Sequence, residues 1–320
     1  MPKSDKYAIG VDLGGTNIKF GIVSQKGKLV EKLSLNSKAD GGPDKVVKQI
    51  KNGISEILSK NKVKIRGIGI GAPGVVSTKK GTVENPPNFP GWVKVNLGSI
   101  ISKGFGYDCF VENDANAAAI GEMIFGAGKK HNSFVMITLG TGVGGGIILN
   151  RKLYRGEIGA AGEVGHITIN YEGPRCNCGS FGCIEAYVGN NYLINKIKAD
   201  LKSSPNQKIL KLVNNNLNLL SPITIQKAAE AGDEYAISVI TQMGSQIGSA
   251  LASVSNLLDV STFIIGGGVS GFGKPLISSI NKSLIERVIT SLKNRVKVLP
   301  AKLKNEAGIL GASALVFYKS

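Results

Sequence analysis

The stretch YAIGVDLGGTNIKFGIV, residues 7–23, determines how the chain begins to fold. Two apolar runs, residues 7–13 and 18–23, flank a turn that carries the glycine pair Gly14-Gly15. Short runs of this kind, rich in β-branched residues and bounded by turn signals, are typical of strands. A further run over residues 28–35 follows the turn at Lys26-Gly27. The chain is therefore predicted to open as an antiparallel meander.

Strand and helix patterns alternate along the rest of the chain. Apolar residues at helical spacing predict a helix over residues 43–60, with Pro43 in its first turn, and another over residues 115–125. The remaining predictions are strands over 65–70, 107–111, 134–139 and 145–149, helices beyond 185 that include a long segment over 223–258, a strand over 262–265, a helix over 275–289, a strand over 296–299 and a last helix after 306. This alternation predicts an α/β architecture with two lobes.

The composition limits the class of protein. A chain of 320 residues with 42% hydrophobic content can bury a substantial core. No signal-like segment precedes the first strand and no run approaches the roughly 18 apolar residues of a membrane span, so we expect a cytoplasmic protein without a membrane partner. The formal charge of +17 favours anionic partners, although scattered surface lysines explain it equally well.

Three glycine-rich turns are candidates for binding phosphate. The first, residues 12–19, offers backbone amides, the hydroxyl of Thr16 and the carboxylate of Asp12, which can face hydrated magnesium. The second, residues 138–146, repeats the same strand-glycine-strand design, and the third, residues 263–270, ends a strand. Taken alone, the first is explained about as well by an ordinary hairpin turn, and the third is explained better by a tight strand-to-helix turn.

Patterns typical of other nucleotide-binding folds also occur, but the residues around them do not fit those folds. Residues 69–74 and 140–145 both match G-x-G-x-x-G, but neither pattern opens a helix, as a dinucleotide-binding site requires. Residues 268–274 resemble a Walker A motif, but Pro275 replaces the hydroxyl residue that would hold magnesium. We therefore exclude both of these nucleotide-binding designs.

One cluster of residues has the spacing of a metal site. Nine residues separate His166 from Cys176, one separates Cys176 from Cys178, and four separate Cys178 from Cys183. Three thiolates and an imidazole form a closed tetrahedral zinc site without a position for a reactive water, so the predicted zinc is structural. Accidentally grouped thiols are the alternative. Cys109 stands apart and is predicted to be a small core residue.

The order of the motifs resembles that of ROK-family sugar kinases. DLGGTNIK, GAPG, NPPNFPGW, ENDANAAA, TLGTGVGGG, GEVGH, CNCGSFGC followed by Glu185, and IIGGG occur in the family's order and span nearly the whole chain. The resemblance implies the actin-like ATPase (ribonuclease H-like) fold, an α/β fold with two lobes and an interlobe active-site cleft. It implies a small lobe of residues 1–115 plus 305–320 and a large lobe of residues 116–304 with the zinc-binding loop.

The resemblance also implies roles for individual residues. Asp114 takes the place of the general base, although an aspartate between a strand and an alanine-rich helix is often a helix cap. The sugar ligands it implies are Gly71, Asn88, Asn113, Asp114, Glu163, His166 and Glu185. The nucleotide ligands it implies are Asp12, Gly14, Gly15, Thr16, Lys19, Thr141, Gly142, Gly267 and Gly268.

The implied reaction moves the γ-phosphoryl group of ATP, with Mg²⁺, to the 6-hydroxyl of glucose, and the implied assembly is a homodimer. Another hexose such as N-acetylmannosamine, fructose or allose remains an alternative acceptor, and polyphosphate remains an alternative donor. The family also contains sugar-responsive repressors with a helix-turn-helix domain ahead of the first phosphate turn. Only eleven residues precede Asp12, so we expect no nucleic-acid partner.

Overall fold

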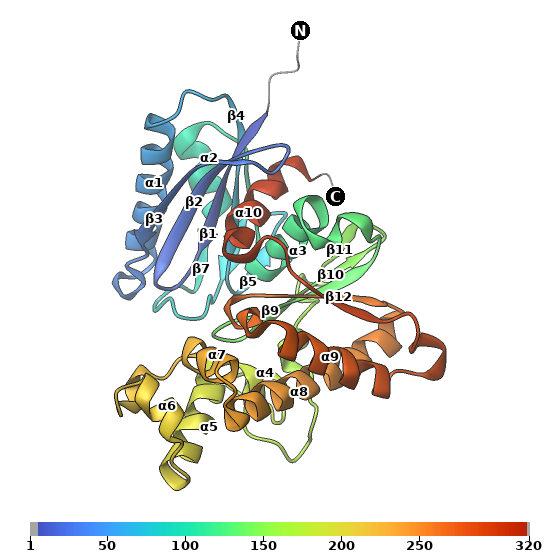
Figure 1. Cartoon of the computed structure of the whole chain (residues 1–320). Helices are drawn as coiled ribbons and strands as arrows, with labels where there is room; N and C mark the ends of the chain where they lie inside the picture. The colour runs from blue at the N-terminus through green and yellow to red at the C-terminus, as the bar shows by residue number, and fades with distance from the viewer. Residues whose placement is uncertain (1–5, 319–320) are drawn as a thin grey trace. The chain divides into compact units, whose positions relative to one another are not determined.

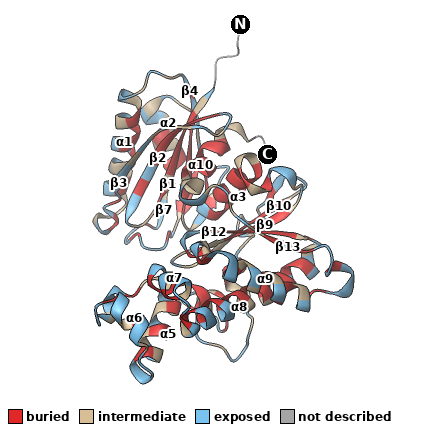
Figure 2. Cartoon of the chain, in the orientation of Figure 1, coloured by how far each residue is buried: buried red, intermediate tan, exposed pale blue. Residues whose placement is uncertain are grey.

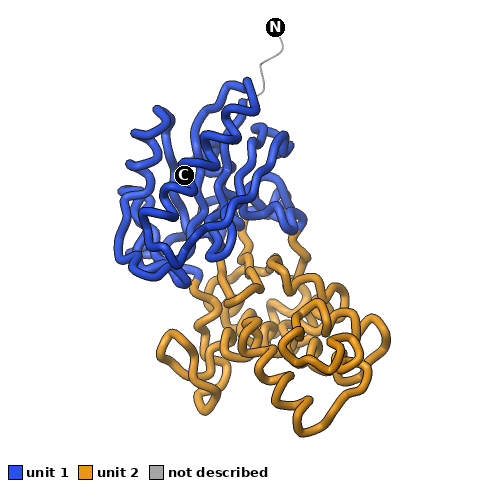
Figure 3. Tube along the Cα trace, turned by 90° about the vertical axis from the view of Figure 1, so that its left-hand side faces the viewer, with its two compact units in different colours: residues 1–132, 146–162, 302–320 blue, residues 133–145, 163–301 orange. Residues whose placement is uncertain are grey.

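The computed structural model describes residues 6–318 and divides the chain into two compact units (Figure 3). Unit 1 comprises residues 1–132, 146–162 and 302–320, and unit 2 comprises residues 133–145 and 163–301. The family resemblance implies lobe boundaries near residues 115 and 305, and these boundaries stay a prediction. None of the helices in residues 6–318 has the length and apolar character that a membrane span requires.

Unit 1 is built on a five-stranded mixed sheet. Its order is β3 (Leu29–Asn36), β2 (Asn17–Ser24), β1 (Tyr7–Leu13), β4 (Ile65–Ala72) and β8 (Cys109–Asn113) (Figure 1). The first three strands pair antiparallel, which confirms the predicted opening meander, and β4 runs parallel to both β1 and β8.

The register of the parallel strands brings three motifs to one edge of this sheet. Asp12 near the end of β1 pairs with Gly71 in β4, and Gly71 pairs with Glu112 in β8. Asn113, the last residue of β8, pairs with Ala72. In open α/β sheets, ligands bind outside the carboxyl ends of parallel strands. This edge is therefore where the fold of unit 1 favours a binding site.

Helices cover both faces of the first sheet, so its central strands are buried (Figure 2). One face packs on α1 (Pro43–Ser59), whose buried Val46, Ile50, Ile54 and Ile57 lie in the same core cluster as Ile9 and Val11. The other face packs on α10 (Ala307–Phe317), which also contacts α3 (Asp114–Phe125). A Cβ at Gly69 would lie 1.8 Å from the carbonyl oxygen of Ala312, so a glycine is required where α10 crosses the sheet.

Two parts of unit 1 were not predicted. A small sheet contains β5 (Val75–Ser77), β6 (Thr82–Glu84) and β7 (Lys94–Val95). A helix, α2 (Leu97–Phe105), follows it and is capped by Asn96, whose side chain accepts from the amide of Ser99. The three strands are two or three residues long, which is too short for an alternating pattern to be visible.

The second sheet has the order β11 (Lys152–Tyr154), β10 (Val143–Leu149), β9 (Phe134–Leu139), β12 (Thr262–Gly266) and β13 (Lys297–Pro300). Strand β12 runs parallel to both β9 and β13. All of these strands except β11 were predicted to within two residues.

The remaining helices belong to unit 2. They are α4 (Glu185–Val188), α5 (Asn190–Ser203), α6 (Gln207–Leu212), α7 (Pro222–Glu230), α8 (Glu234–Leu258) and α9 (Gly273–Arg287). The prediction of one long helical segment over residues 223–258 was wrong. Gly232 has a φ of 75° and Asp233 caps α8 by accepting from the amide of Ala236, so the chain breaks into two helices there.

Candidate active site and metal cluster

The junction of β8 and α3 carries the residue expected to act as a base. Asn113 caps the helix, because its Oδ1 accepts from the amides of Ala115 at 3.0 Å and Asn116 at 3.2 Å. The capping task therefore does not depend on Asp114. The carboxylate of Asp114 accepts from the amide of Ala115 at 2.8 Å and its side chain reaches solvent.

Two carboxyl groups at this edge have raised pKa values. Desolvation by the surrounding protein raises the pKa of Asp114, and the hydrogen bond from Ala115 partly opposes that effect. Desolvation also raises the pKa of Asp12; the ammonium group of Lys19 at 3.8 Å lowers it, and the charge of Asp114 raises it further. A carboxylate with a raised pKa accepts a proton more readily, which suits a general base.

The first glycine turn is closed by backbone hydrogen bonds on both sides. The amide of Gly14 donates to the carbonyl of Asn17 at 3.1 Å, and the amide of Ser37 donates to the carbonyl of Thr16 at 2.9 Å. The side chains of Thr16 and Lys19 are exposed. The turn thus presents the amide, hydroxyl and ammonium donors that a phosphate chain needs.

Asp12 is suited to a divalent cation. A Cβ at Gly308 would lie 2.3 Å from the carboxylate of Asp12, so a larger residue at the start of α10 would displace this carboxylate. Burial raises the pKa of Asp12 more than the ammonium group of Lys19 lowers it. A hard cation such as Mg²⁺ prefers oxygen ligands and would supply the missing positive charge.

Gly71 and Asn88 are two of the predicted sugar ligands that belong to unit 1. A Cβ at Gly71 would be 3.6 Å from the Cα of Asp114, so the backbone of β4 approaches the proposed base closely. Asn88 is exposed with a φ of 67°, and its Cβ would lie 3.2 Å from a Cβ at Gly15. Trp92 anchors this loop, because its buried indole donates to the carbonyl of Val83 at 3.1 Å.

An ion pair beside the proposed base was not identified from the sequence. Glu112 is 3% exposed, and its carboxylate accepts from Arg155 Nε at 2.9 Å, the amide of Asn113 at 3.0 Å and Asn116 Nδ2 at 3.2 Å. A buried charge requires such compensation. Glu112 lies inside the motif ENDANAAA, but 43 residues separate it from Arg155, and no spacing rule connects two residues so far apart.

Unit 2 holds the other expected sugar ligands. Glu163 has a side chain that is 62% exposed, with its Oε2 3.9 Å from His166 Nε2. Glu185 begins α4, and its Oε2 accepts from the amide of Val143 at 2.9 Å. The exposure of Glu163 leaves its carboxylate available to a ligand.

The other two glycine turns also lie in unit 2. Thr141 and Gly142 form the tip of the turn between β9 and β10. Gly267 follows β12 with a φ of 87°, and a Cβ there would lie 2.2 Å from the carbonyl oxygen of Leu139. Beside it, a Cβ at Gly268 would meet no atom within 4 Å, so the backbone of this turn has open space beside it.

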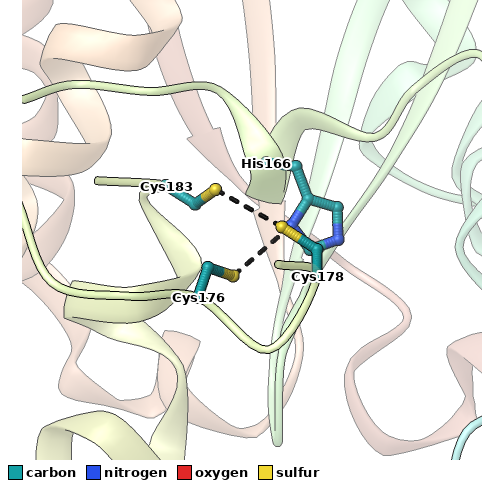
Figure 4. A group of neighbouring side chains, drawn as sticks. All are labelled: His166, Cys176, Cys178 and Cys183. Atoms are coloured by element: carbon teal, nitrogen blue, oxygen red, sulfur yellow. Dashed lines mark hydrogen bonds between the residues drawn. The ribbon is translucent and has the colours of Figure 1, made fainter. Parts of the chain in front are cut away.

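The four predicted metal ligands converge (Figure 4). The ligand atoms of His166, Cys176, Cys178 and Cys183 all lie within 4.8 Å of one another. His166 Nδ1 is 3.8 Å from Cys176 Sγ, and Cys178 Sγ is 3.7 Å from Cys183 Sγ. Zn–S bonds of about 2.3 Å at the tetrahedral angle place two sulfurs ~3.8 Å apart, so the cluster fits zinc.

The backbone shapes the loop that carries these thiols. The amide of Cys176 donates to the carbonyl of Ser180 at 2.8 Å, and the amide of Gly179 donates to the carbonyl of Cys176 at 3.0 Å. At Gly182, with a φ of 66°, a Cβ would lie 1.7 Å from the carbonyl oxygen of Asn170. The glycine is therefore needed to bring Cys183 back to the cluster.

The thiols differ in how readily they ionise. Burial raises the pKa of Cys176, and it raises the pKa of Cys183 to about 12. A backbone hydrogen bond from Ser180 lowers the pKa of Cys178. A metal binds the thiolate form of cysteine. A cation that displaces these protons would therefore stabilise the close grouping of the three cysteines.

Comparison with known proteins finds similar sequences and structures over nearly the whole chain. The ROK family profile matches residues 8–319. A glucokinase from Thermotoga maritima is 33% identical over 99% of this chain and 98% of its own length. The structure of a ROK family glucokinase from Streptomyces griseus in complex with glucose and AMPPNP is 36% identical, with a TM-score of 0.86 over 97% of this chain and 98% of that chain.

A protein with a different activity is also similar. A xylose repressor from Caldicellulosiruptor bescii is 31% identical over 96% of this chain and 77% of its own length. Sequence similarity alone therefore does not distinguish a kinase from a repressor. The predicted α/β fold of the actin-like ATPase type is confirmed by these relatives together with the two mixed sheets.

Proposed function

The chain belongs to the ROK family, and on that premise we propose that it is an ATP-dependent glucokinase. The observation that carries the proposal is the division of tasks at the start of α3. Asn113 caps the helix, so Asp114 is available as a base next to Asp12 and the first glycine turn. A repressor binds its sugar without needing a base, so this arrangement favours the kinase.

In the proposed reaction, Asp114 accepts the proton of the 6-hydroxyl of glucose. The sugar oxygen bonds to the γ-phosphorus of ATP, the bond from that phosphorus to the bridging oxygen breaks, and ADP leaves with the electron pair. Gly71, Asn88, Asn113, Glu163, His166 and Glu185 orient the sugar. Because phosphoryl transfer requires mainly alignment and charge stabilisation, these contacts account for much of the rate.

We assign the nucleotide to the glycine turns. Asp12, Gly14, Gly15, Thr16, Lys19, Thr141, Gly142, Gly267 and Gly268 form this set. Magnesium, when bound, would neutralise charge on the phosphates of ATP, and Asp12 is the carboxylate that we assign to hold it. Zinc, when bound by His166, Cys176, Cys178 and Cys183, stabilises the loop that carries them.

His166 can serve both sites. Its Nδ1 faces the thiols, whereas its Nε2 faces Glu163. Metal ligation through one ring nitrogen fixes the orientation of the other, which is then free to bind a hydroxyl. This supports a sugar role for the imidazole in addition to its role in the cluster.

The test is a coupled kinase assay over glucose, mannose, fructose, allose and N-acetylmannosamine, with ATP or polyphosphate as donor. We expect the highest kcat/KM with glucose and ATP. Turnover with another hexose or with polyphosphate would change the substrate and keep the kinase. No turnover with any of these sugars, together with sequence-specific DNA binding in a gel shift, would favour a sugar-responsive regulator.

We also propose a cytoplasmic homodimer. The cytoplasm supplies ATP and keeps the three clustered thiols reduced for metal binding. The dimer is proposed because the family resemblance implies it, and a measurement of the molecular mass in solution tests it.

A further inference from the structure

The carboxylate of Glu185 lies against the second glycine turn. Its Oε2 accepts from the amide of Val143 at 2.9 Å. A Cβ at Gly142 would lie 2.3 Å from the same oxygen, so a larger residue in the turn would displace the carboxylate from this position. Glu185 thus contacts the backbone of the turn that we assign to phosphate.

A second contact attaches the other end of the turn to the same segment. The amide of Asn190, at the start of α5, donates to the carbonyl of Gly140 at 3.1 Å. Within the turn, the amide of Gly140 donates to the carbonyl of Gly142 at 3.0 Å. Residues 140–143 are therefore held at both ends by the segment 185–190, with Thr141 at the tip.

The other side of Glu185 faces the metal cluster. Its Oε1 lies 3.9 Å from Cys176 Sγ, and the amide of Ala186 donates to the carbonyl of Cys183 at 3.0 Å. The carboxylate therefore lies between the loop that binds the metal and the glycine turn. A charge-assisted hydrogen bond to a backbone amide is stronger than a neutral one.

We infer that Glu185 is a positioning residue for the nucleotide as well as a sugar ligand. The inference rests on the proposed function, in which this turn holds the phosphates of ATP. A carboxylate offers about four acceptor positions, so one oxygen can hold Val143 while the group still binds a hydroxyl. The consequence is specific: the affinity for nucleotide depends on Glu185 even when no sugar is present.

The experiment measures binding of AMPPNP with magnesium, without sugar, by isothermal titration calorimetry. Glu185→Ala removes the acceptor and should weaken AMPPNP binding about five- to tenfold, the effect expected for the loss of one ordinary hydrogen bond. Glu185→Gln keeps a carbonyl that can accept from Val143, so its AMPPNP affinity should stay within about twofold of wild type. Glucose affinity, measured separately, should fall in both variants.

Glu163→Gln is the matched control. Glu163 is also a proposed sugar ligand, but within the described residues 6–318 its side chain makes no hydrogen bond to the turn of residues 140–143. The variant should therefore weaken glucose binding and leave AMPPNP affinity unchanged. Unchanged AMPPNP affinity in folded Glu185→Ala would overturn the inference, as would equal losses in all three variants. If Glu185→Ala does not fold, Glu185→Asp replaces it, because its side chain is one methylene shorter and should lengthen the contact with Val143, with a loss in the same direction.

The two proposals fail in different ways. Suppose that the wild-type protein binds AMPPNP and phosphorylates glucose, but that Glu185→Ala binds AMPPNP with normal affinity. This result contradicts only the role of Glu185. Wild-type protein that binds neither AMPPNP nor sugar contradicts the kinase itself and the inference with it.

Discussion

Asn113 and Asp114 separate two tasks that a single aspartate often performs at the start of a helix. The amide oxygen of Asn113 satisfies two backbone donors of α3. Asp114 keeps a solvent-accessible carboxylate whose charged form is disfavoured by the surrounding protein. A carboxylate that is not the sole cap of its helix and has a raised pKa is a candidate for chemistry.

Replacing Asp114 by asparagine removes the proposed base and retains the shape of the side chain. We expect kcat to fall by roughly 10²-fold or more, the loss typical of acid–base assistance. The dissociation constants of glucose and AMPPNP should change by less than about threefold, because the cap at Asn113 is intact. Steady-state kinetics and calorimetry measure both quantities, and near-normal turnover would remove Asp114 from the mechanism.

The raised pKa of Asp114 predicts the pH dependence of activity. Only the ionised carboxylate accepts a proton, so kcat/KM for glucose should fall as the pH drops through the pKa of Asp114. Because desolvation raises that pKa, the midpoint of the fall should lie above the ordinary value of about 3.9. The pKa of Asp12 is also raised, so protonation of Asp12 should make the fall of kcat/KM at low pH steeper.

The assay measures kcat/KM against pH at saturating ATP, with circular dichroism at each pH as the control for unfolding. A rate that stays constant down to about pH 4 would show that no group with a raised pKa takes part.

At the scale of elements, the start of α3 is held by the ion pair of Glu112 with Arg155. Removing one partner leaves the other charge buried, which usually costs more than the pair contributes to stability. Arg155→Met should lower the free energy of unfolding by about 2–3 kcal/mol and kcat by about tenfold, since small displacements of a base are costly. Denaturant unfolding and steady-state kinetics measure the two effects.

The double variant Arg155→Met with Glu112→Gln distinguishes stability from positioning. It removes both charges, so most of the lost stability should return, because no uncompensated charge remains. If the pair positions Asp114, kcat should stay low in the double variant. Recovery of kcat together with stability would instead assign the pair a structural role alone.

The metal loop is the second element whose contribution can be measured. Cys178→Ser should abolish stoichiometric zinc and lower the thermal midpoint by roughly 10 °C, since a bound structural metal contributes folding free energy and each kcal/mol shifts the midpoint by about 2–4 °C in a domain of this size. Cys109→Ala is the matched control, because Cys109 lies in the other unit and burial raises the pKa of its thiol to about 12.

Zinc content is measured by atomic absorption on protein purified without chelator. Wild-type protein that lacks zinc and has the same midpoint as Cys178→Ser would indicate accidentally grouped thiols. Loss of zinc should also weaken glucose binding, because His166 belongs to the cluster and Glu185 lies next to it.

The elements that were predicted correctly are those with a long apolar pattern. The strand of residues 7–13 is a nearly continuous buried run bounded by turn signals, and the helix from Pro43 buries side chains at helical spacing, so both patterns are visible in the sequence. The break at Gly232 was missed because the apolar pattern resumes in phase beyond it. The strands around Val76 and Val83 are too short to show any period.

For the candidate site, local motifs predicted the metal cluster because its ligands lie within one loop. Contacts between distant segments were not predictable. Glu122, fully buried in α3, accepts from the amides of Ala127 at 2.5 Å and Leu303 at 2.8 Å. The second contact spans 181 residues and depends on how the whole of unit 1 folds. The pairing of Glu112 with Arg155 is hidden in the sequence for the same reason.

At the scale of the whole molecule, the charge of +17 should affect how fast an anionic donor arrives. A positive field raises the rate at which anions encounter the protein, and salt screens it. Raising the salt from about 0.05 to 0.5 M shortens the Debye length from more than 10 Å to about 4 Å. We expect kcat/KM for ATP to fall several-fold over this range while kcat changes little.

Glucose supplies an internal control, because a neutral sugar is not steered by the field. Its kcat/KM at saturating ATP should therefore stay nearly constant over the same salt range. A parallel fall for both substrates would point to a loss of stability or of a bound cation. A constant kcat/KM for ATP would show that the positive charge is dispersed over the surface and does not act on the donor.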